Sequence, residues 1–137
     1  MRARIAALIV AVAGIAAATA GPASATTAAG EAGGVSCTAV VNHPCVWQQK
    51  DGGGGVIGVA QVSPAHPAQL TLVQVEVKTQ RAWGSPWVTV ASATTLQTGF
   101  AKAVTPRVVT NELTMICATG GPAQDAAQRV TSCTSPF

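Results

Sequence analysis

The chain has 137 residues, of which 48% are hydrophobic and only 9% are charged, and its formal net charge is +3. This length fits one domain rather than several. The basic residues are scattered along the sequence instead of forming the cluster that a nucleic-acid-binding face needs, so we expect no nucleic-acid partner.

Residues 1–25 have the layout of a secretory signal peptide. Arg2 and Arg4 form a cationic start, an uncharged apolar run follows to about residue 20, and residues 23–25 have the small side chains that a signal peptidase accepts. The apolar run is shorter than the roughly 20 strongly apolar residues of a membrane span. We therefore expect cleavage after Ala25, or alternatively after Ala20. The mature protein is expected to be secreted and free of the membrane, with association with the cell wall as the alternative to release into the medium.

Residues 26–34 are small and are predicted to form a flexible leader, whereas residues 35–137 are predicted to form one domain. That domain is rich in β-branched residues with turn residues at short intervals, which is typical of an all-β fold. The predicted strands are 35–41, 45–50, 56–62, 70–79, 87–92, 95–104, 107–119 and 129–134. Their number and spacing favour a small immunoglobulin-like antiparallel β-sandwich of seven or eight strands, and a small Greek-key β-barrel is the alternative.

The clearest strand pattern lies between Thr71 and Lys78. Val73, Val75 and Val77 alternate with polar residues along this segment. Because successive side chains of a strand point to opposite faces, the valines are predicted to face the core and the polar residues to face solvent.

Four cysteines follow the predicted signal peptide: Cys37, Cys45, Cys117 and Cys133. An even number in a small exported domain indicates disulfides, and the C-x2-C spacing that zinc sites favour is absent. Three pairings are possible. The spacing favours Cys37 with Cys45 and Cys117 with Cys133, so that each bridge closes a local loop.

The glycines at 53, 55 and 58 formally match the G-x-G-x-x-G motif. A dinucleotide site needs a helix directly after this motif, whereas a β-branched segment follows here. We therefore interpret residues 51–55 as a hairpin loop and expect no cofactor.

Catalytic groups are sparse in this sequence. His43 and His66 each precede a proline in a predicted loop, and the acidic residues do not form the close pair that glycosidases use. We expect no enzyme activity and no metal site, and a small hydrolase that uses one of these histidines is the alternative.

The candidate ligand-binding residues are Arg81, Trp83 and Trp87. Trp83 falls in a predicted turn between two strands, where an exposed indole beside an arginine is a typical anchor for a protein or a sugar ring. The alternative is that Trp83 folds back over the edge of the sheet. Trp87 begins the next strand and is expected to pack in the core.

Together these features predict a secreted, monomeric, non-catalytic binding module for an extracellular protein or glycan. The predicted binding loops are 81–86 and 120–128. A secreted enzyme inhibitor and a structural cell-wall or surface protein are the alternatives.

Overall fold

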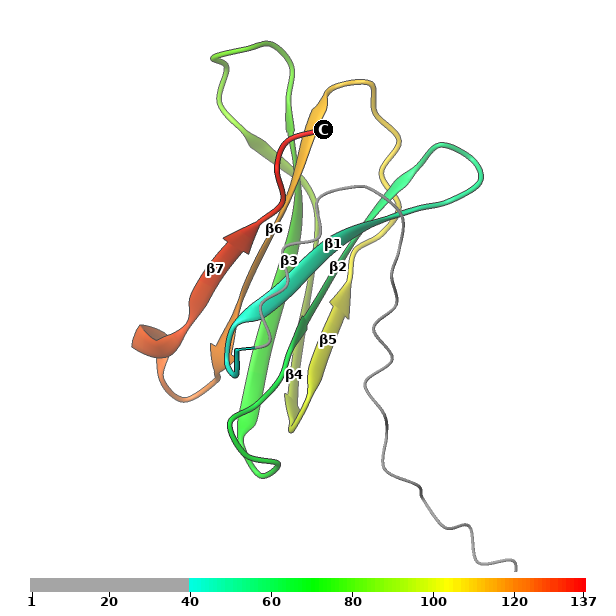
Figure 1. Ribbon diagram of the computed structural model, residues 1–137. Coiled ribbons are helices and arrows are strands. Elements are labelled where there is room, and N and C mark those ends of the chain that lie inside the picture. The colour runs from blue at the N-terminus through cyan, green and yellow to red at the C-terminus, as the bar shows by residue number, and fades with distance from the viewer. Residues whose placement is uncertain (1–39) are drawn as a thin grey trace, which may run out of the picture.

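Two antiparallel β-sheets face each other in the computed structural model, which describes residues 40–137 (Figure 1). The strands are β1 (Pro44–Lys50), β2 (Val56–Val62), β3 (Leu70–Gln80), β4 (Val88–Thr98), β5 (Ala101–Val104), β6 (Leu113–Pro122) and β7 (Val130–Cys133). One sheet has the order β1-β2-β5 and the other has the order β4-β3-β6-β7. The all-β prediction is confirmed.

Several predicted features lie outside the described residues. They are the signal peptide at 1–25, the leader at 26–34, most of the strand expected at 35–41, and Cys37. The described end of that expected strand is a turn instead, because the His43 N–H donates to the Val40 carbonyl and Asn42 takes a φ of +63°. Asparagine tolerates this left-handed conformation better than most residues do.

The alternation predicted for β3 is confirmed. Val73, Val75 and Val77 are fully buried, whereas the polar residues between them are partly exposed. The core is made of small aliphatic side chains from both sheets: Val46, Ala60, Val62, Val73, Val75, Val77, Ala101, Ala103, Ile116 and Ala118. Packing these side chains between the two sheets removes their apolar surface from water, which is the main stabilising contribution in such a domain.

The strands expected at 87–92 and 95–104 are divided at a different place. The chain runs without interruption from Val88 to Thr98 as β4, turns at Gly99, and continues as β5. Gly99 has a φ of +83°, a conformation that favours glycine, and its N–H donates to the Gln69 carbonyl at 2.8 Å. The single glycine therefore marks the turn, and the Ala-Thr segment before it stays extended.

The strand expected at 107–119 corresponds to β6, which begins at Leu113 and ends at Pro122 and thus lies later in the chain than predicted. Residues 107–112 form a loop with one isolated bridge between Val56 and Val108, and Gly120, Gly121 and Pro122 belong to the strand. A Cβ atom on Gly120 would lie 2.4 Å from Cγ2 of Val62 in the facing sheet. Gly120 is therefore a packing residue that lets the two sheets approach, and not the start of a loop as the sequence predicts.

Cys117 and Cys133 form a disulfide between directly opposite positions of β6 and β7, with a Cα–Cα distance of 4.1 Å. The predicted bridge across the loop between the last two strands is confirmed. Beyond Cys133 the chain continues beside β6, because the Thr134 N–H donates to the Ile116 carbonyl and the Phe137 N–H to the Thr114 carbonyl, both at 2.9 Å. The pairing of Cys37 with Cys45 stays a prediction.

The β1–β2 hairpin carries the glycine-rich loop, and the strand β2 follows it, as the hairpin interpretation requires. Oδ1 of Asp51 accepts hydrogen bonds from the N–H groups of Gly53 at 3.1 Å and Gly55 at 2.7 Å. The Arg107 side chain pairs with Asp51 and lies where side chains on Gly53 or Gly55 would be. The glycines thus make room for an arginine that ties the hairpin to the β5–β6 loop.

Candidate binding site at the β3–β4 loop

The loop between β3 and β4 contains a β-turn formed by residues 82–85. The Ser85 N–H donates to the Ala82 carbonyl at 3.0 Å, and Gly84 has a φ of +85°. Because Trp83, the second residue, has no positive φ, the positive φ at the third residue is that of a type II turn, in which glycine is the favoured residue. The sequence Ala82-Trp83-Gly84-Ser85 therefore places Trp83 at the tip of the turn.

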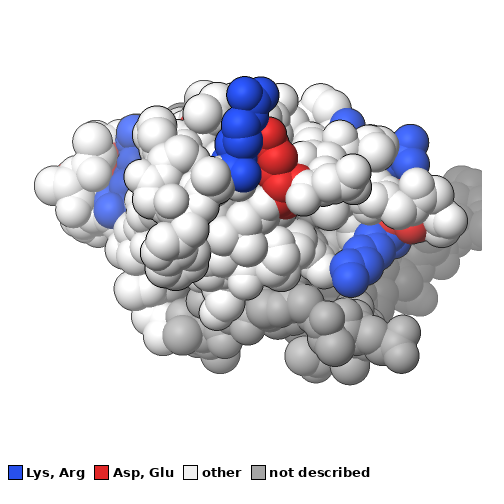
Figure 2. Space-filling model, turned by 90° about the horizontal axis from the view of Figure 1, so that it is seen from above, with Lys and Arg blue, Asp and Glu red and all other residues white. Residues whose placement is uncertain are grey.

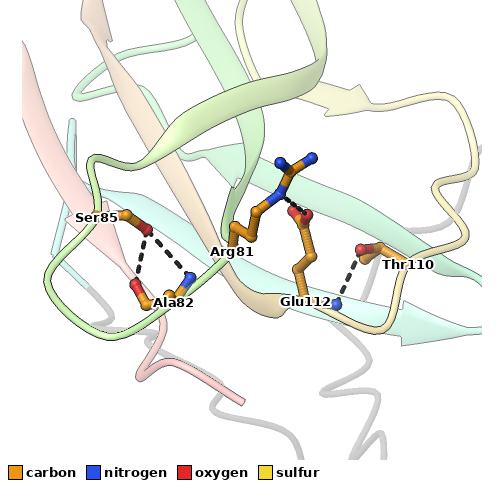
Figure 3. A network of polar contacts seen from close by, with 5 residues as sticks. All are labelled: Arg81, Ala82, Ser85, Thr110 and Glu112. Atoms are coloured by element: carbon orange, nitrogen blue, oxygen red, sulfur yellow. Dashed lines mark hydrogen bonds and ion pairs between the residues drawn. The ribbon is translucent and has the colours of Figure 1, made fainter.

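Side chains brace this turn from within (Figure 3). The Ser85 hydroxyl donates to the Ala82 carbonyl at 2.6 Å and accepts from the Ala82 N–H at 3.1 Å. The amide of Gln80, which is buried at the end of β3, donates to the Ser85 carbonyl at 2.6 Å. The loop is thus held in one conformation by bonds that use its own polar groups.

Trp83 is 94% exposed. The alternative in which this side chain folds back over the edge of the sheet is wrong, because packing against the sheet would cover one face of the indole. Burying an indole contributes more free energy than burying most side chains, and leaving it in water forgoes that contribution.

Trp87 lies at the surface and not in the core, which corrects the sequence-based expectation. It is partly exposed and lines an open pocket of about 350 Å³. The other residues of this pocket are Gln80, Trp83, Gly84, Leu113 and Pro136. The strand β4 begins only at Val88 and its first three residues are themselves exposed, so a position at the start of this strand does not place a side chain in the core. The structure thus brings Trp83 and Trp87 together on one side of the loop.

Arg81 lies on the other side of the same loop. Its Nε is 3.6 Å from Oε1 of Glu112, and its side chain is 90% exposed (Figure 3). The Glu112 N–H donates to the Thr110 hydroxyl at 3.0 Å, which fixes the backbone of the β5–β6 loop beside the arginine. A second open pocket, of about 310 Å³, lies here and includes Arg81, Val88, Val90 and Glu112 in its lining.

The end of the domain that carries this loop is largely uncharged. Figure 2 looks onto that end from above and shows mostly white surface, with blue and red side chains lying beside one another. Asp51 and Arg107 form an ion pair between the other two loops at this end (Figure 1). The Gly55 N–H contributes most to lowering the pKa of Asp51 below its ordinary value of 3.8, and Arg107 and the Gly53 N–H add to it against an opposing desolvation.

The two predicted binding loops lie at opposite ends of the domain, which is a correction (Figure 1). The loop expected at 120–128 is shorter, because Gly120–Pro122 belong to β6, and it contains a single 3-10 turn at Ala126–Gln128. Together with residues 65–70 it lines a polar pocket of about 370 Å³. One continuous binding surface formed by the two predicted loops is therefore excluded.

This second pocket contains His66 and Asp125. The Asp125 carboxylate accepts hydrogen bonds from the Ala127 N–H at 3.0 Å and from the Gln128 amide at 2.8 Å. Oδ1 of Asp125 therefore caps the 3-10 turn, and Oδ2 pairs with the side chain of Gln128. His43, the other histidine, lies in the turn before β1.

Within residues 40–137, no three His, Cys, Asp or Glu side chains lie close enough together to hold a metal ion. The same range contains no helix that is long and apolar enough to cross a membrane.

Sequence reasoning named Arg81, Trp83 and Trp87 as candidates but missed Gln80, Leu113 and Glu112. Gln80 continues the polar face of β3 in the sequence, and nothing there shows that its amide braces a turn. Leu113 and Glu112 are more than twenty-five residues away along the chain and reach the site only because β6 pairs with β3, with Leu113 opposite Gln80.

Comparison with family models, with curated proteins and with solved structures finds no match to this chain. The function therefore has to be argued from the site itself.

Proposed function

We propose that this protein is a secreted, non-catalytic binding module that engages an extracellular partner through the β3–β4 loop, with Trp83 as the anchor. The observation that carries this proposal is the 94% exposure of an indole at the tip of a braced turn. Tryptophan and arginine are the residue types most enriched among those that dominate binding energy at protein interfaces.

The bracing of the loop supports this role. Binding costs free energy when a flexible loop must be ordered, and a loop already held in one conformation avoids most of that cost. Gln80, Ser85 and Gly84 fix the backbone on either side of Trp83 before any partner arrives. Trp87 and Leu113 then supply apolar surface beside the indole, which a sugar ring or a protein side chain contacts without further rearrangement.

We further propose an immunoglobulin-like fold with two local disulfides. The constant-type immunoglobulin order is A-B-E-D in one sheet and C-F-G in the other. If β1, β2 and β3 correspond to A, B and C, and β5, β6 and β7 to E, F and G, then the sheet β1-β2-β5 has the order A-B-E and the strands β3-β6-β7 have the order C-F-G. The remaining strand, β4, extends the second sheet beside β3. This relationship favours the immunoglobulin-like sandwich over a barrel, and the second disulfide would link Cys37 to Cys45.

A secreted enzyme inhibitor is the second candidate. Inhibitors of this kind present a rigid exposed loop to the active site of the enzyme, and the β3–β4 loop is both braced and exposed. The proposal of a wall-associated structural protein lacks a comparable observation.

The experiment that tests the proposal compares retention of the mature protein, with its disulfides intact, on isolated cell walls, on immobilised glycans and on secreted proteins including proteases. Trp83→Ala should weaken retention on the true partner by a factor of about 30, which corresponds to a hot-spot loss of about 2 kcal/mol. Phe100→Ala is the matched control, because Phe100 is an exposed aromatic residue at the opposite end of the domain. Equal retention of both variants and the wild type would refute the anchor role of Trp83.

A further inference from the structure

Among the described strands, β4 forms a long edge that has no charged residue and no proline, and its one irregularity, a bulge at Val90, lies near its start. It is hydrogen-bonded on one side to β3, and it is the outermost strand of its sheet. Its 11 residues, VTVASATTLQT, include no charged residue, no proline and no glycine. Exposed edges of this kind are templates for pairing with another strand.

The other described edges are each protected. The strand β5 has four residues and carries Lys102, and β7 has only four residues. The strand β1 begins at Pro44 and ends at Lys50. Short length, lysine and proline are the usual means of blocking edge pairing, so the absence of all three is specific to β4.

We propose that β4 pairs with β4 of a second copy of this chain, so that the two four-stranded sheets form one continuous sheet across a two-fold axis. An antiparallel strand pair formed by one sequence is self-complementary, as a two-fold interface requires. Since β4 is uncharged, no register of this pairing places like charges opposite each other. The expectation from the sequence is a monomer. The sequence does not show which strands lie at the edge of a sheet, so it gives no indication of this pairing.

The register follows from the irregularities of β4. Its ladder with β3 is continuous from Ala91 to Thr98, with a bulge beyond Ala91 and the turn at Gly99 after Thr98. Two directly opposite residues of an antiparallel pair point to the same face of the sheet. In the symmetric β4–β4 pair the two-fold axis must therefore lie level with one residue, which is then opposite its own copy, and not between two successive residues. The residues nearest the middle of this stretch are Thr94 and Thr95, and an axis at Thr94 places Ser92 opposite Leu96 of the second copy.

Exposed apolar residues on β4 support a second copy of this chain as the partner of this edge. Leu96 is 56% exposed and Val90 is 47% exposed, and both lie on a strand whose remaining residues are mostly Thr, Ser and Ala. Small and β-branched residues pack well against a neighbouring strand. A second identical strand would place Ser92 beside Leu96 and pair the free backbone groups of the stretch from Ala91 to Thr98 at the same time.

The dimer would change how the candidate binding loop is displayed. Because the paired strands are antiparallel, the two β3–β4 loops would extend from opposite ends of the shared sheet, roughly 40 Å apart at 3.3 Å per residue. Two binding loops on one particle would bind a repetitive surface more tightly than one loop does. This consequence rests on the proposed function, whereas the dimer itself does not.

Sedimentation of the mature, disulfide-intact protein over a range of concentrations tests the dimer without reference to any ligand. The wild type should show a concentration-dependent monomer–dimer equilibrium. Thr94→Lys should raise the dimer dissociation constant at least tenfold, because the two ammonium groups would lie at or beside the axis. Ser135→Lys adds the same charge near the opposite edge of the sheet and should leave the dimer unchanged.

Leu96→Lys provides a second exposed site on β4, and thermal melting of each variant establishes that it is folded. A wild type that stays monomeric at all concentrations would overturn the proposal, including the case in which the chain's own N-terminal residues cover β4. A dimer that persists in both folded lysine variants would overturn it equally. Loss of partner binding with an intact dimer, by contrast, would count against the proposed function only.

Discussion

Trp83 and Gly84 occupy the two central positions of one β-turn, in which Gly84 has a positive φ and Trp83 is 94% exposed. A side chain at position 84 would meet no atom within 4 Å, so the requirement for glycine is conformational and not steric. The turn that carries the indole therefore requires a left-handed residue directly after Trp83.

Gly84→Ala should lower the stability of the turn by about 1–2 kcal/mol, which is the cost of a left-handed conformation for a residue with a Cβ. Urea unfolding measures the part of this cost that reaches the global stability, and hydrogen exchange of the Ser85 amide measures the local opening. Gly52→Ala is the matched control, since position 52 is open and has no positive φ. If the two variants behave alike in both measurements, the turn does not depend on Gly84.

Gly120→Ala should destabilise the domain by about 1–3 kcal/mol, because its new methyl group would overlap the side chain of Val62. Val62→Ala on the facing sheet removes Cγ2 of Val62, which is the atom that the new methyl group would overlap. Denaturant unfolding of both single variants and the double variant should show that the double variant loses less stability than the sum of the two. Strict additivity would mean that the sheets do not approach each other at Gly120.

The contrast between Gly84, Gly99 and Gly120 shows how much the sequence predicted. Alternation of apolar and polar residues located β3 to within one residue, because burial on one face imposes a period of two. The strand β2 has no such alternation and was located by its β-branched residues between turn residues. The sequence predicts a turn at Gly84, which is correct, and at Gly120, which is wrong, whereas Gly99 falls inside the strand expected at 95–104 and is a turn in the structure. Only the distance to the facing sheet distinguishes a glycine that permits a turn from one that permits close packing.

The candidate site was predicted in part for a related reason. The composition of residues 81–86 identified an exposed turn with an arginine and an indole, since these are local properties. The bracing by Gln80, the ion pair of Arg81 with Glu112 and the pocket beside Trp87 depend on the pairing of β3 with β6. The prediction that residues 120–128 belong to the same site failed because the polarity of a loop does not reveal its end of the domain.

Asp51→Asn should lower the melting temperature at neutral pH, because it removes the charge that pairs with Arg107. The pKa of Asp51 is lower in the folded state than its ordinary value of 3.8, so its charged form stabilises the fold above that pH. This stabilisation is lost as the pH falls through the lowered pKa. Melting temperatures of the wild type and the variant, measured from pH 7 to pH 2, should therefore differ at neutral pH and converge in acid. A difference that stays constant down to pH 2 would contradict the ionic role of Asp51.

Replacing Cys117 and Cys133 together by serine should cost about 3 kcal/mol, since the bridge closes a loop of 16 residues in the unfolded chain. Urea unfolding measures this loss. The amides of Thr134 and Phe137 should lose hydrogen-exchange protection first, because their bonds to β6 follow directly on the bridge. Non-reducing peptide mapping of the wild type should recover Cys117 linked to Cys133, and a link from either residue to Cys37 would contradict the described pairing.

The fluorescence of Trp83 tests the central claim most directly. A variant with Trp47→Phe and Trp87→Phe retains Trp83 as its single tryptophan. In the free protein its emission should be that of a solvated indole, fully quenched by acrylamide. When the variant is saturated with the partner retained in the binding assays, the emission should shift to shorter wavelength and the quenching should fall several-fold. An indole that stays equally accessible in the saturated complex would contradict the assignment of Trp83 as the anchor.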